Sequence, residues 1–154
     1  MSKVIITNVT DPVCPWCWGE EPYFRKLETH FPNLIIWRNV MGGLVEDMNK
    51  NKPADMDATA YYNKENKDFI NHCLETAEKH HMPIKVEGFK LFSETENSSF
   101  PLCIAFKAAQ MANMEKADLF LYNLRAAAMA EARQAITESE LIAIADESGI
   151  DIAA

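Results

Sequence analysis

Two of the four cysteines, Cys14 and Cys17, form a Cys-x-x-C pair, which we call the thiol pair. If a helix begins at Cys14, this spacing places both thiols on one helix face within reach of a disulfide bond. The unpaired N–H groups of a first helical turn favour a thiolate, and Cys14 feels them more than Cys17. We therefore expect Cys14 to attack a disulfide and Cys17 to resolve the resulting mixed disulfide.

A Cys-x-x-C pair can also be half of a zinc site, which requires two further ligands. The other cysteines, Cys73 and Cys103, stand alone, and His80 and His81 are adjacent rather than spaced as a ligand pair. The sequence thus favours redox chemistry and predicts no metal. A structural disulfide or a buried pair of thiols stays open as the third interpretation.

The composition is that of a soluble globular domain, with 48% hydrophobic and 25% charged residues in a chain of 154. A net charge of -8 disfavours nucleic acid and anionic membrane surfaces as partners, because both would be repelled. The sequence has no apolar run long enough for a membrane span and no signal-peptide pattern. We expect a cytoplasmic protein, in which a Cys-x-x-C pair is more often catalytic than structural.

A strand, a helix and a second strand are predicted at the start of the chain. The unbroken β-branched run of residues 4–9 is typical of a strand buried on both faces of a parallel sheet, and Pro12 ends it. A helix follows from Cys14 to about His30, with a kink expected at Pro22. Residues 34–40 form the second strand, which completes a parallel, right-handed βαβ unit.

The rest of the chain has helical periodicity. Gly42 and Gly43 first break the pattern, with a turn or a ligand-binding loop as interpretations. Helices are then expected over about 58–79, from Ser98-Ser99-Phe100-Pro101 onward, and over about 115–133. The pattern Thr137-Glu138-Ser139-Glu140 predicts a capping box for a last helix, which Gly149 ends.

Three segments carry a family resemblance. The run Val9-Thr10-Asp11-Pro12-Val13-Cys14-Pro15-Trp16-Cys17-Trp18 resembles the active-site segment of DsbA-like thioredoxin-fold proteins. The FrnE-like oxidoreductases, the 2-hydroxychromene-2-carboxylate isomerases and the Spx-degradation adaptors of Gram-positive bacteria are the most similar groups. Met41-Gly42-Gly43-Leu44 is similar to a Gly-Gly-Leu of these proteins, and Asn97-Ser98-Ser99 looks like another family segment.

The resemblance implies an α/β fold that is one incomplete domain. Residues 1–45 would form a thioredoxin-like βαβ part and residues 58–150 a large helical insertion, with the C-terminal ββα part absent from this chain. That part carries the family's cis-proline, whereas the last proline here is Pro101. Because two strands alone do not make a stable sheet, we expect the chain to be a fragment of a protein of roughly 200 residues. If the chain ends here, we expect a homodimer, a domain swap or a partner to cover the strands.

The resemblance also implies a function. It suggests a thiol-disulfide oxidoreductase that acts on protein or small-molecule thiols and disulfides, with no cofactor but with glutathione as a co-substrate. Pro15 and Trp16 would influence the redox poise, and Trp18, Gly42 and Gly43 would line a substrate groove. Two alternatives stay open: a glutathione-dependent isomerase or transferase, and a non-enzymatic adaptor that presents a transcription factor to a protease.

Overall fold

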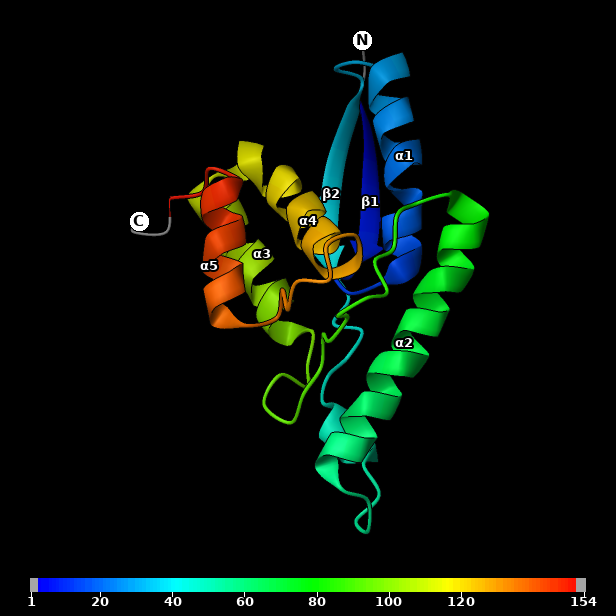
Figure 1. The fold of residues 1–154 in the computed structure, drawn as a ribbon. Helices are drawn as coiled ribbons and strands as arrows, with labels where there is room; N and C mark the ends of the chain where they lie inside the picture. The colour runs from blue at the N-terminus through cyan, green and yellow to red at the C-terminus, as the bar shows by residue number, and fades with distance from the viewer. Residues whose placement is uncertain (1–2, 152–154) are drawn as a thin grey trace.

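The computed structural model describes residues 3–151, which form a βαβ unit followed by a set of helices (Figure 1). This arrangement confirms the predicted α/β class with a large helical part. Within the described residues, every helix is too short or too polar to cross a bilayer. The elements are β1 (Val4–Thr10), α1 (Pro15–His30), β2 (Ile35–Met41), the 3-10 helix η1 (Met48–Asn51), α2 (Ala58–His80), α3 (Phe100–Ala112), α4 (Met114–Met129) and α5 (Glu138–Glu147).

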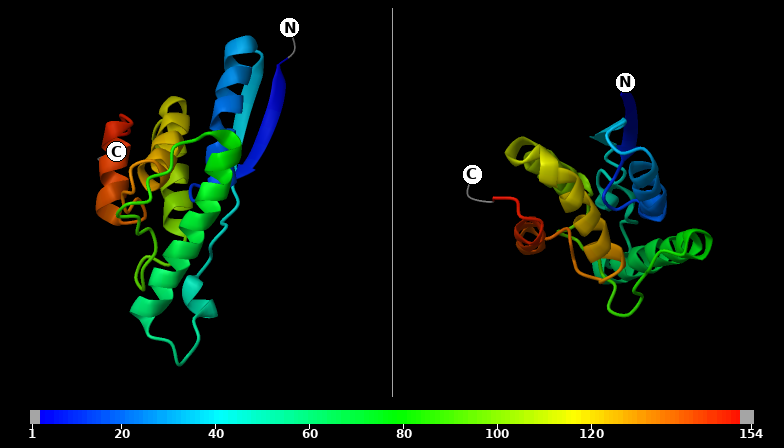
Figure 2. Two further views of the ribbon diagram at one scale, coloured as in Figure 1. Left: turned by 45° about the vertical axis from the view of Figure 1, so that its right-hand side comes forward. Right: turned by 90° about the horizontal axis from the view of Figure 1, so that it is seen from above.

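The two strands pair in parallel, with Val4 opposite Ile35 and Thr10 opposite Met41. Helix α1, which includes Pro22, packs on one face of this sheet, where the rings of Phe24 and Trp37 lie 5.0 Å apart. Figure 2 shows that the helices lie on one side of the strands. Because the strands are parallel, their carboxyl ends lie at the same edge of the sheet, next to the start of α1 and the helical part of the molecule (Figure 1).

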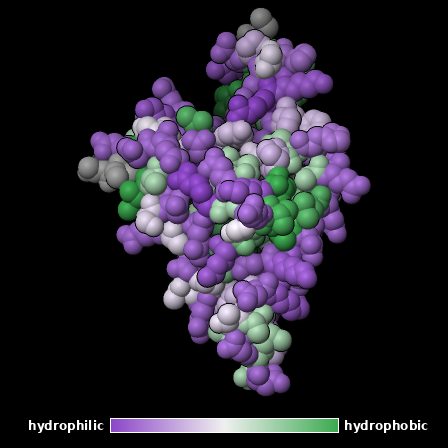
Figure 3. Space-filling view, viewed as in Figure 1, coloured by the Kyte–Doolittle hydropathy of each residue, from purple (hydrophilic) through white to green (hydrophobic). Residues whose placement is uncertain are grey.

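The prediction that the first strand is buried on both faces is wrong for the described chain. Val4, Ile5 and Val9 are 59%, 65% and 70% exposed. The sheet of the described residues has two strands, so no third strand or second helix layer covers the face opposite α1. Ile5 and Val9 lie on this uncovered face, whereas Val4 is at the first position of the strand, on the face of α1. In the view of Figure 3, which is that of Figure 1, the surface of the molecule is largely hydrophilic, with small hydrophobic patches.

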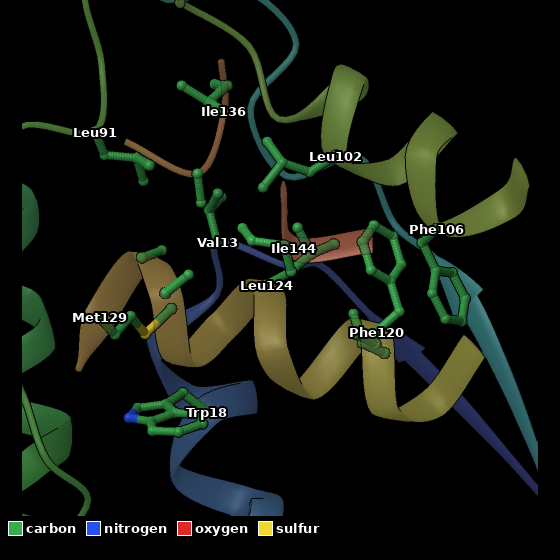
Figure 4. Close-up of a cluster of buried hydrophobic side chains, with 14 of the residues drawn as sticks. Val13, Trp18, Leu91, Leu102, Phe106, Phe120, Leu124, Met129, Ile136 and Ile144 are labelled. Carbon is green, nitrogen blue, oxygen red and sulfur yellow. The ribbon is translucent and has the colours of Figure 1, made fainter. Parts of the chain in front are cut away.

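The hydrophobic core lies in the helical part rather than under the sheet (Figure 4). Its centre is α4, which packs against α3 and α5. Burying each large apolar side chain contributes about 1.5–3 kcal/mol to the free energy of folding. Val13 and Trp18 bring the start of α1 into this core. The other large members are almost fully buried: Leu91, Phe92, Leu102, Phe106, Phe120, Leu124, Met129 and Ile144.

The helix ends differ from the predictions in two places. Helix α4 ends at Met129 rather than near residue 133. The predicted capping box does not form, because the Thr137 hydroxyl donates to the Gln134 carbonyl and Glu140 accepts from Arg133 Nε at 2.7 Å. Gly149 has a φ of +72°, as the prediction of a glycine stop requires.

Candidate active site

The thiol pair occupies the N-terminal end of α1. Cys14 is the N-cap residue, so the helix begins at Pro15, one position later than predicted. Proline suits this position because its missing N–H would have no helical partner there. The backbone N–H of Cys17 donates to Cys14 Sγ at 3.4 Å, and both cysteines are half-buried free thiols. The sulfur of Cys14 therefore faces the unpaired amides of the first turn, as the spacing predicts.

The expectation that the thiolate forms more readily at Cys14 than at Cys17 is wrong, because the pKa shifts of the two thiols favour the thiolate at Cys17. The hydrogen bond between the two sulfurs lowers the pKa of Cys17 to about 6 and raises the pKa of Cys14. The Thr10 hydroxyl, the Asp11 backbone and the charge of Arg125 lower the pKa of Cys17 further, against the effect of burial. The reduced pair therefore carries one negative charge near neutral pH, and that charge is favoured on the Cys17 sulfur, with the proton on Cys14.

Arg125 is a site residue that sequence reasoning missed. Its side chain is 1% exposed; Nη2 donates to Thr10 Oγ1, and Nη1 forms an ion pair with Glu21. These contacts join α4 to the end of β1 and to the second turn of α1. A burial signal was present in the sequence, because an arginine beside Leu124 on an apolar helix needs a buried partner.

Sequence reasoning also missed the structural role of Asp11, whose buried carboxylate connects three segments. Oδ1 accepts the N–H of Val13 at 2.9 Å, and Oδ2 accepts the N–H of Leu44 at 2.7 Å and the hydroxyl of Ser99 at 2.9 Å. The Cys103 thiol also points to Oδ2, at 3.4 Å. One carboxylate thus holds the loop before the thiol pair, the Gly-Gly loop and the start of α3 together.

Trp16 lies against α2. Its Nε1 donates to His72 Nε2 at 3.2 Å, the ring of His80 stands edge-on at 5.7 Å, and Lys79 Nζ lies 4.9 Å from the ring centre. Pro15 beside it is buried. The C-terminal half of α2 therefore forms a wall next to the thiol pair, built from aromatic and basic side chains.

The three residues expected to line a substrate groove lie in two different settings. Trp18 lines no groove, because it is 1% exposed and its Nε1 donates to the Pro83 carbonyl at 3.1 Å. Gly42 and Gly43, by contrast, line an open groove of about 750 Å³ between β2 and α3. Gly43 has a φ of +65°, and the ring of Phe100 lies where its Cβ would be.

The two remaining thiols are poorly suited to attack. Burial raises the pKa of Cys73 to about 12. Burial and the neighbouring charge of Asp11 raise the pKa of Cys103 to about 12. Within residues 3–151, no three His, Cys, Asp or Glu side chains cluster as a metal site requires. The low-pKa chemistry of the described chain is thus concentrated in the thiol pair.

Two curated relatives resemble the chain in sequence. It is 22% identical over 144 residues to the ClpXP adapter protein SpxH of Bacillus subtilis, covering 92% of this chain and 44% of that protein. It is 25% identical over 148 residues to the SpxH of Halalkalibacterium halodurans, covering 96% of this chain and 46% of that protein. The chain therefore spans less than half the length of these relatives.

The fold is also that of known thioredoxin-like structures. The cytosolic disulfide reductase DsbM of Pseudomonas aeruginosa superposes with a TM-score of 0.72 at 19% identity, over 97% of this chain and 66% of that one. The same reductase solved with GSH gives a TM-score of 0.70 at 19% identity, over 96% of this chain and 66% of that one. The sequence pattern of the thioredoxin family matches residues 8–154. The chain belongs to the thioredoxin family and has its DsbA-like form.

Proposed function

We propose that the protein is a thiol-disulfide oxidoreductase that works through the thiol pair. The observation that carries this proposal is the geometry of Cys14 and Cys17 on the first turn of α1, with a hydrogen bond from the Cys17 N–H to the Cys14 sulfur. The lowered pKa of Cys17 supplies a thiolate within the pair near neutral pH. Thiolates rather than thiols perform disulfide exchange.

The reaction takes two exchange steps. The Cys14 sulfur attacks one sulfur of a substrate disulfide, so that a Cys14–substrate bond forms and the other substrate sulfur leaves as a thiolate. When Cys14 attacks, the proton shared in the pair passes to Cys17. After losing this proton, Cys17 attacks Cys14, which forms the intramolecular disulfide and releases the second substrate thiolate. The substrate gains two electrons and the thiol pair loses two.

We further propose that small-molecule thiols of the glutathione class return the protein to its reduced form. Two such thiols would reduce the Cys14–Cys17 disulfide and leave as one oxidised dimer. The DsbM structure solved with GSH supports this assignment, as does the partial exposure of both thiols of the pair. The cytosolic description of DsbM supports the cytoplasmic location that we propose for this chain.

An adaptor function is the second candidate, because both curated relatives are described as ClpXP adapter proteins and align with over nine-tenths of this chain. An adaptor would bind its partner through a surface and would not need the thiol pair. The two functions are therefore separable by removing the sulfurs.

Reduction of insulin by glutathione, followed by turbidity, tests the enzyme. We expect Cys14→Ser to lower the rate at least about 100-fold, because Cys17 alone cannot form the intramolecular disulfide and burial raises the pKa of both Cys73 and Cys103. Cys17→Ser should accumulate a mixed disulfide with substrate at Cys14, detectable by mass spectrometry. Cys73→Ala is the matched control, since Cys73 lies in the interior of α2 and should not alter the rate.

Unchanged insulin reduction by Cys14→Ser would refute the enzymatic proposal. The same variant addresses the adaptor candidate. If Cys14→Ser retains delivery of a partner to a ClpXP protease, measured as the partner's half-life, the adaptor function is independent of the sulfurs. If neither variant nor wild type shortens that half-life, the adaptor candidate fails.

A further inference from the structure

A buried cation, Arg125, acts on the resolving cysteine from the side of α4. Arg125 is 1% exposed, so its charge is hardly screened by solvent. Its Nη1 is neutralised by Glu21, which lies four residues after Cys17 on α1. Its Nη2 donates to the hydroxyl of Thr10, the last residue of β1. The guanidinium is thus fixed by two partners on two elements.

This arrangement determines where the Thr10 hydroxyl hydrogen goes. A threonine hydroxyl has one hydrogen to donate and two lone pairs that accept. Because Arg125 Nη2 occupies an accepting position, the Thr10 hydrogen is free for another acceptor. The neighbouring acceptor is the Cys17 sulfur. The hydrogen bond that the Thr10 hydroxyl donates to this sulfur lowers the pKa of Cys17. The arginine therefore acts on Cys17 both through its charge and through the orientation of Thr10.

We propose that Arg125 is a positioning residue for Cys17: it directs the Thr10 hydroxyl at the Cys17 sulfur and stabilises the thiolate that this sulfur becomes. This inference rests on the proposed function. When an external thiolate attacks the Cys14 sulfur of the Cys14–Cys17 disulfide, a bond to Cys14 forms and the bond to Cys17 breaks. The electron pair stays on Cys17, which leaves as the thiolate that Thr10 and Arg125 receive.

Other charged groups around the thiol pair come from each neighbouring element. Asp11 lies in the loop before α1, Glu21 on α1, and His72, Lys79 and His80 on α2 against Trp16. Among these, Glu21 offers an opposing change, because it neutralises Arg125 without being hydrogen-bonded to Thr10. Removing the arginine charge and removing the glutamate charge should act on Cys17 in opposite directions.

The test is the thiolate absorbance of the reduced protein against pH, in wild type, Arg125→Met, Glu21→Gln and Thr10→Val. Methionine keeps much of the apolar stem of Arg125 without its charge. We expect Arg125→Met to raise the apparent pKa of the pair by about one pH unit. Thr10→Val should raise it by less, and Glu21→Gln should lower it, because the arginine charge is then uncompensated.

Equilibration with glutathione gives a second readout. From a pKa of about 6 for Cys17, a rise of about one unit makes the reduced form about fivefold less favourable at pH 7. This change corresponds to a potential about 20 mV more reducing. Loss of packing alone would not move the potential in opposite directions in Arg125→Met and Glu21→Gln.

Opposite shifts in these two variants support the proposal, and no shift or shifts in one direction in folded protein overturn it. If Arg125→Met does not fold, Thr10→Val and Glu21→Gln carry the test, since both leave the guanidinium in place. In that case, the proposal is overturned if Thr10→Val leaves the apparent pKa of the pair unchanged and Glu21→Gln raises it. Failure of the proposed function is seen separately, as insulin reduction that survives Cys14→Ser while the titration remains measurable.

Discussion

Replacing Asp11 by asparagine should destabilise the protein by about 3 kcal/mol. The carboxylate is 3% exposed and accepts three N–H or O–H donors, from Val13, Leu44 and Ser99. An asparagine has one accepting oxygen, so one side of the amide must turn its NH₂ group toward a donor. Hydrogen bonds to a charged acceptor contribute about 1.5–3 kcal/mol each and neutral ones about 1 kcal/mol. Losing one such bond and weakening the other two gives the expected total.

Urea denaturation of the reduced protein, followed by circular dichroism, measures this loss as a lower midpoint at an unchanged slope. Asp47→Asn is the matched control. Asp47 caps η1 through one hydrogen bond to the Asn49 N–H, and asparagine caps a helix as well as aspartate does. A stability of Asp11→Asn within about 1 kcal/mol of wild type would refute the argument that this carboxylate joins the three segments.

Three further predictions concern glycine, pH and thiol reactivity. Gly43→Ala should lower the free energy of unfolding by about 1–3 kcal/mol, because the φ of Gly43 is positive and the ring of Phe100 fills the Cβ position. Gly42→Ala should leave the stability nearly unchanged, and urea midpoints compare the two variants. The pKa of Cys17 is lowered from 9.0 to about 6, so the reduced protein should gain stability from pH 6 to pH 9 and lose it as pH falls; thermal melts against the oxidised protein test this. Iodoacetamide at pH 8 should modify the thiol pair before Cys73 and Cys103, as peptide mass spectrometry would detect.

Local patterns predicted the position of the thiol pair and the order of the elements. The i, i+3 spacing of Cys14 and Cys17, with a proline suited to the first helical position, needs only the geometry of one helical turn. The βαβ unit likewise follows from two β-branched runs on either side of a helical period. These features depend on residues close in the chain, so their sequence signals are complete.

The supporting residues could not be assigned in the same way. Arg125 contacts Thr10 across 115 positions of sequence, and Ser99 contacts Asp11 across 88. A single sequence contains no signal that pairs such distant positions. At most, a polar residue within an apolar helix indicated a buried polar side chain, without naming its partner. Trp18 failed as a groove residue for a related reason: its neighbours in the fold, Pro83 and Tyr122, belong to distant segments.

The uneven distribution of the core also determines how the protein opens. Amides of α4 are buried among α3 and α5, whereas β1 pairs with one strand and exposes its apolar side chains. Local opening is easiest where few apolar contacts must break, so amide exchange should begin in the strands and reach α4 only in global unfolding. Because Cys14 follows β1 and Val13 is held in the core, the thiol pair lies on the boundary between these two cooperative units. Partial opening of the strands would then alter the support behind Cys17 while the helical unit stays folded.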